Sequence, residues 1–74
     1  MFPVLMAQEL AKANIWLDTA ERSAIPRVRV RCIARATEAR NAVTYWLRND
    51  DAFPEDSVPA VEDALRKLNE RLAR

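Results

Sequence analysis

The stretch RVRVRC, residues 27–32, decides the fold class of this chain, because it fits two kinds of secondary structure. Arginine alternates strictly with a small apolar residue or cysteine, which is the pattern of a half-buried β-strand. The stretch follows a proline, Pro26, and precedes a run of residues with helical spacing. The question is therefore whether it forms a strand or opens a long helix.

The residues that follow favour the helix. Apolar residues recur at intervals of three and four, as on one face of a helix: Ala36, Ala39, Val43 and Trp46. The same spacing continues backwards to Cys32, to Val28 or Arg29, and to Ile25. Pro26 suits the first turn of a helix, where its missing N–H costs no hydrogen bond. We therefore predict a helix over residues 26–49 that includes the alternating stretch.

Two flanking segments show the same periodicity. The first predicts a helix over residues 3–21 and carries Met6, Leu10, Ala13, Leu17 and Ala20 on one face. The second predicts a helix over residues 57–74, with Ser57 or Asp56 as its N-cap, and carries Val58, Val61, Leu65, Leu68 and Leu72. Short connections between three helices predict up-down-up packing. We expect a single all-α domain over residues 1–74, a small three-helix bundle.

The strand interpretation remains an alternative. A strand at residues 27–31, a helix from Ala34 and a second helix from Ser57 resemble a ribbon-helix-helix DNA-binding unit. The resemblance implies that two chains pair their strands and place the arginine side chains in the major groove of DNA. The chain departs from that pattern because no turn residue follows Cys32 and because a whole helix precedes the strand.

The composition excludes several kinds of chemistry. The chain has no histidine, so Ser-His and Cys-His nucleophile pairs and histidine-containing zinc sites cannot form within it. It has no glycine, which excludes glycine-rich phosphate loops. The single cysteine, Cys32, lies on the predicted core face, and the acidic residues near 50–56 fit a helix-capping connection better than a cation site. We expect no enzymatic activity, no metal and no cofactor.

The charge is nearly balanced but unevenly placed. Twelve basic and eleven acidic residues give a net charge of +1. Four arginines crowd the first turns of the predicted second helix, where the helix dipole disfavours positive charge: Arg27, Arg29, Arg31 and Arg35. Up-down-up packing would bring them next to Arg71 and Arg74 at the end of the third helix. Asp18 and Glu21, at the end of the first helix, are the acidic residues expected to offset part of this charge.

Several apolar or aromatic residues lie off the predicted core faces and are predicted contact residues. These are Ile15, Val30, Ile33 and Tyr45. Together with the arginines they predict a non-enzymatic protein-protein interaction module, a small accessory regulator or inhibitor of the size class that includes phage- and plasmid-encoded ones. The expected partner is a protein with an acidic surface.

Two further expectations follow from size and from the N-terminal sequence. A 74-residue domain buries only about 60% of the surface of its unfolded chain, so we expect a homodimer. The apolar run at residues 1–7 is too short for a membrane span and has no preceding basic region, so we expect no membrane association and a cytoplasmic location. The alternative function is a DNA-binding transcriptional regulator that uses the segment Arg27–Arg35.

Overall fold

The computed structural model describes residues 4–49 and 54–73, and these form three α-helices. Helix α1 spans Val4–Arg22, α2 spans Pro26–Asn49 and α3 spans Val58–Leu72, with a short 3-10 helix, η1, at Glu55–Ser57. The predicted three-helix fold is confirmed, with helix ends within two residues of those expected. The strand alternative is wrong, because residues 27–31 lie inside α2 and no strand occurs among the described residues.

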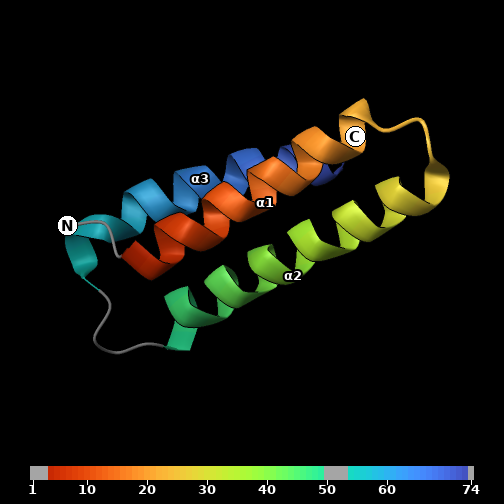
Figure 1. Ribbon diagram of the computed structural model, residues 1–74. Helices are drawn as coiled ribbons and strands as arrows, with labels where there is room; N and C mark the ends of the chain where they lie inside the picture. Colours follow the sequence, from red (N-terminus) through yellow and green to blue (C-terminus); the bar gives the residue numbers. More distant parts are fainter. Residues whose placement is uncertain (1–3, 50–53, 74) are drawn as a thin grey trace.

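The three helices run up, down and up along a rod of 41 × 18 × 16 Å. Figure 1 shows α1 and α2 antiparallel and side by side, with α3 running antiparallel to α2. The end of α1, the start of α2 and the end of α3 consequently lie at one end of the rod. The C-terminal end of α2 and the start of α3 lie at the opposite end of the rod.

Small residues let α1 and α2 approach closely. Ala13 of α1 and Ala36 of α2 are each 0% exposed, and Ala20 and Ala39 are also buried. Because the distance between two packed helices depends on the side chains at their contact, alanine at these positions allows a short separation. The prediction that the alanine and leucine faces of the helices form the core is therefore confirmed.

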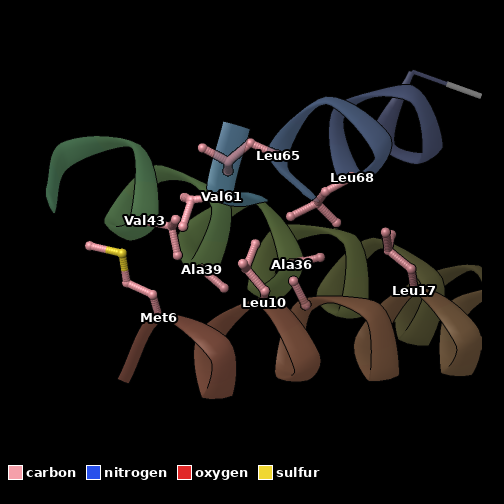
Figure 2. Packing of buried hydrophobic residues seen from close by; sticks show 10 residues of the cluster. Met6, Leu10, Leu17, Ala36, Ala39, Val43, Val61, Leu65 and Leu68 are labelled. Carbon is pink, nitrogen blue, oxygen red and sulfur yellow. The ribbon is translucent and has the colours of Figure 1, made fainter. Parts of the chain in front are cut away.

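Larger side chains from α3 complete the core. Figure 2 shows Val61, Leu65 and Leu68 directed from α3 towards the α1–α2 pair. Val61 and Leu68 are almost fully buried, as is Val43 of α2. The bundle is thus a close α1–α2 pair on which α3 packs through its branched aliphatic face.

The connection between α1 and α2 turns without glycine. The Ser23 N–H donates to the carbonyl oxygen of Thr19 at 3.1 Å, which closes α1, and the Ser23 hydroxyl accepts a hydrogen bond from the Ile25 N–H at 3.1 Å. A serine hydroxyl used in this way stabilises a tight turn. Helix α2 begins at once, since the Arg29 N–H donates to the carbonyl oxygen of Ile25 at 3.1 Å. No described residue has a positive φ, so none needs the conformational freedom of glycine.

Ser57 is the N-cap of α3, as predicted, and Pro59 lies in the first turn. The Ser57 backbone is nearly helical, with φ −88° and ψ −15°, and its hydroxyl makes no capping hydrogen bond. The preceding turn η1 brings the chain into helical geometry before α3 begins. The other predicted N-cap, Asp56, lies within η1.

Candidate protein-binding surface

Arginines gather at the end of the rod where α2 begins. We call this surface the basic end and define it by four exposed residues: Arg22, the last residue of α1, and Arg27, Arg29 and Arg31 in the first two turns of α2. None of the four has an ion-pair partner within 4 Å among residues 4–49 and 54–73. The basic end therefore presents four exposed guanidinium groups that form no ion pair with a described residue.

The acidic side chains at this end, Asp18 and Glu21, form ion pairs with an arginine of α3. Arg71 of α3 places Nη2 2.8 Å from Asp18 Oδ1 and 3.2 Å from Glu21 Oε1. Its Nη1 donates to Asn14 Oδ1 at 2.8 Å. The hydrogen bond to Asp18 is the main cause of a raised pKa at Arg71, with Glu21 adding to it. The sequence suggested that Asp18 and Glu21 offset the arginines of α2, and the structure instead shows them fixing α3 to α1.

The arginines of α2 are divided between two faces. Arg27 and Arg31 are four residues apart and lie on one ridge of the helix. Arg29 lies on a different face of the helix. Together with Ile33 it lines a cavity of about 190 Å³, which Leu72 of α3 also lines. A strand would have directed all three arginines to one side. Arg35 is partly neutralised, since its Nη1 lies 3.8 Å from Glu38 Oε2.

Exposed aliphatic residues accompany these arginines. Val30, three residues after Arg27 and therefore its neighbour on the helix surface, is 69% exposed. Ile33 is 41% exposed and Ile25, in the connection before α2, is 59% exposed. Sequence reasoning identified Val30 and Ile33 but missed Ile25 and Arg22, because both were assigned to the connection between helices. Ile25 could have been identified from the sequence, because it is an apolar residue in an otherwise polar connection.

The remaining predicted contact residues are not part of the basic end. Tyr45 is 64% exposed but lies fourteen residues beyond Arg31, about 21 Å along the helix. Ile15 is 61% exposed on the face of α1 opposite its buried residues. Arg71 lies at the correct end but is held by its contacts within the chain. Arg74 falls outside the described residues.

The acidic residues at the other end of the rod are described only in part. Asp50 and Asp51, in the acidic connection near residues 50–56, lie outside the described residues. Asp63 of α3 is paired with Arg66 at 2.8 Å and with Lys67 at 3.0 Å, and these hydrogen bonds lower the pKa of its carboxyl group. Its charge is therefore balanced within α3.

Cysteine and carboxylate groups form no metal cluster in the part of the chain that the structure describes. The thiol of Cys32 is buried on the core face of α2. No described helix is both long enough and apolar enough to cross a membrane. Comparisons of the chain with protein-family models, with curated proteins and with solved structures found no match.

Proposed function

We propose that this protein is a non-enzymatic interaction module whose basic end docks on an acidic surface of a partner protein. It acts as a small accessory regulator or inhibitor by occupying that surface. The observation that carries the proposal is that Arg27, Arg29 and Arg31 have no ion-pair partners among the described residues, although Asp18 and Glu21 lie at the same end. Those acids are already used by Arg71.

The position of the arginines supports a role in binding over a role in folding. Positive charges in the first turn of a helix are disfavoured by the helix dipole, by about 0.3 to 1 kcal/mol each near the terminus. Carboxylates supplied by a partner would remove this unfavourable term and form charge-assisted hydrogen bonds. Binding to an acidic partner should therefore be more favourable for the basic end than for a surface without charge.

The residues between the arginines support a protein partner over DNA. Ile25 and Val30 are exposed aliphatic side chains, which gain free energy when they are buried against an apolar surface. No aromatic side chain of residues 4–49 and 54–73 is placed to stack on bases at the basic end, because Trp16 and Trp46 pack against the core and Tyr45 lies far along α2. A cytoplasmic location is part of the proposal, since the buried lone thiol calls for no oxidising compartment.

The test compares three proteins in a nuclease-treated extract of the source cells: wild type, the triple variant Arg27→Ala/Arg29→Ala/Arg31→Ala, and a control of equal net charge. The control, Lys12→Ala/Arg66→Ala/Lys67→Ala, removes three cations that pair within their own helices. Proteins captured on immobilised chains are identified by mass spectrometry. We expect a specific partner to be retained by wild type and the control and lost with the triple variant.

Three results would contradict the proposal. The first is equal retention of the same proteins by all three chains, and the second is no specific retention by wild type. The third is tight binding of wild type to fluorescein-labelled duplex DNA that falls steeply with salt and disappears in the triple variant, which would establish the DNA-binding alternative.

A further inference from the structure

An open groove of about 820 Å³ runs between the second half of α2 and one side of α3. Its apolar lining comes from Leu47 of α2, from Val58 and Leu65 of α3, and from Ala73 directly after α3. Four charged side chains also line it: Arg48, Glu62, Arg66 and Glu70. Unlike the basic end, this surface carries equal numbers of positive and negative groups.

Most polar groups of the groove already have partners within the chain. The Thr44 hydroxyl donates to the carbonyl oxygen of Arg40 at 2.9 Å, and Asn69 Oδ1 accepts a hydrogen bond from Arg40 Nη1 at 2.8 Å. Arg66 donates to Glu70 at 2.8 Å. Covering these groups therefore leaves their hydrogen bonds intact.

Two charged groups of the groove remain without an ion pair in the part of the chain that the structure describes. They are Arg48, near the end of α2, and Glu62, near the start of α3. Both lie towards the same end of the molecule, because α2 and α3 are antiparallel. Both line the groove, one from each of the two helices that form its walls. An occupant must supply a carboxylate to one wall and a cation to the other.

We propose that the occupant is a second copy of this chain, bound as a symmetric dimer with the two grooves face to face. A two-fold axis along the groove places α2 of each copy opposite α3 of the other, because an isologous interface presents the same patch twice. Arg48 of each copy then meets Glu62 of the second copy, which gives two equivalent ion pairs. The apolar lining of both grooves is buried between them.

The charges of the groove favour a second copy over other occupants. A strongly acidic partner would satisfy Arg48 but would be repelled by Glu62, and a basic partner would meet the reverse problem. In the dimer, Glu62 of one copy supplies the carboxylate for Arg48 of the other, and Arg48 supplies the cation for Glu62. The dimer also enlarges the small core expected of a 74-residue domain. The groove lies away from the start of α2, so the dimer leaves the basic end free and does not rest on the proposed function.

The test is sedimentation equilibrium over a concentration series of wild type, Arg48→Glu, Glu62→Arg and an equimolar mixture of the two variants. We expect wild type to dimerise and each variant to dimerise at least tenfold more weakly, because each places like charges together twice. In the mixture, the introduced glutamate of one chain would meet the introduced arginine of the other, and the unchanged Arg48 and Glu62 would meet as in wild type. The mixture should therefore recover a dimer that contains one chain of each kind.

Glu38→Arg is the matched control, since it reverses an exposed charge of α2 that does not line the groove and should leave dimerisation unchanged. Circular dichroism checks that each variant keeps its helices. A wild type that stays monomeric would overturn the proposal, as would single variants that dimerise like wild type. Variants that weaken the dimer but do not recover it on mixing would also overturn it, because only pairing between copies restores both contacts.

Discussion

Arg71 has more interhelical polar contacts than any other described residue. Its guanidinium joins α3 to Asn14, Asp18 and Glu21 of α1, and its side chain is only 22% exposed. Arg27, Arg29 and Arg31 of α2 have no ion-pair partner among the described residues, while Asp18 and Glu21 pair with Arg71. A single side chain thus contributes both to the position of α3 and to the charge of the basic end.

Replacing Arg71 by methionine should lower the free energy of unfolding by about 1 kcal/mol, since the ion pairs it loses have carboxylates that are more than half exposed and screened by water. Urea unfolding measures the change. The loss should shrink as salt rises, because the interaction is electrostatic. Lys67→Met is the control, because Lys67 pairs only within α3 and should change stability much less. Equal losses in both variants would show that Arg71 does not anchor α3.

The sequence predicted where Arg71 lies in the bundle. It did not predict which residues Arg71 contacts. Helical spacing and topology placed it at the correct end of the bundle. Its partners lie 50 to 57 residues away along the chain, and the spacing of residues says nothing about which arginine binds which acid. Periodicity identifies faces, whereas ion-pair partners depend on side-chain geometry.

At the scale of the helix, the alternating stretch shows why a period of two does not by itself establish a strand. Within α2, Val28 is half-buried and Val30 is exposed, so the two valines do not share a buried face as they would in a strand. Cys32 is buried because it continues the helical series through Ala36 and Val43. The periodicity of the longer segment, together with Pro26, predicted the structure correctly.

The close pairing of α1 and α2 depends on alanine. Replacing Ala36, which is fully buried, by leucine should destabilise the bundle by about 1 to 3 kcal/mol, because the added methyl groups have no space. Ala34→Leu is the matched control, since Ala34 is exposed on the same helix and should change stability by no more than about 0.5 kcal/mol. Thermal or urea unfolding distinguishes them. A well-tolerated leucine at position 36 would contradict close packing at this point.

At the scale of the whole molecule, the fold places the end of α1, the start of α2 and the end of α3 together. This arrangement followed from three periodic segments and short connections, and the sequence therefore predicted where the basic end lies. The composition of the basic end was predicted only in part. Arg22 and Ile25 were not among the predicted contact residues, because both were assigned to the connection between helices and the apolar spacing that reaches Ile25 belongs to the core face.

The central claim is that the arginines at the start of α2 serve a partner and not the fold. The most direct test is the free energy of unfolding of the isolated triple variant Arg27→Ala/Arg29→Ala/Arg31→Ala, measured by urea denaturation against wild type. We predict that the variant is at least as stable as wild type, with a gain of about 1 kcal/mol, because it removes positive charge from the positive end of the helix dipole and introduces alanine. A loss of about 1 kcal/mol or more would contradict the account, since it would show that these arginines hold the bundle together.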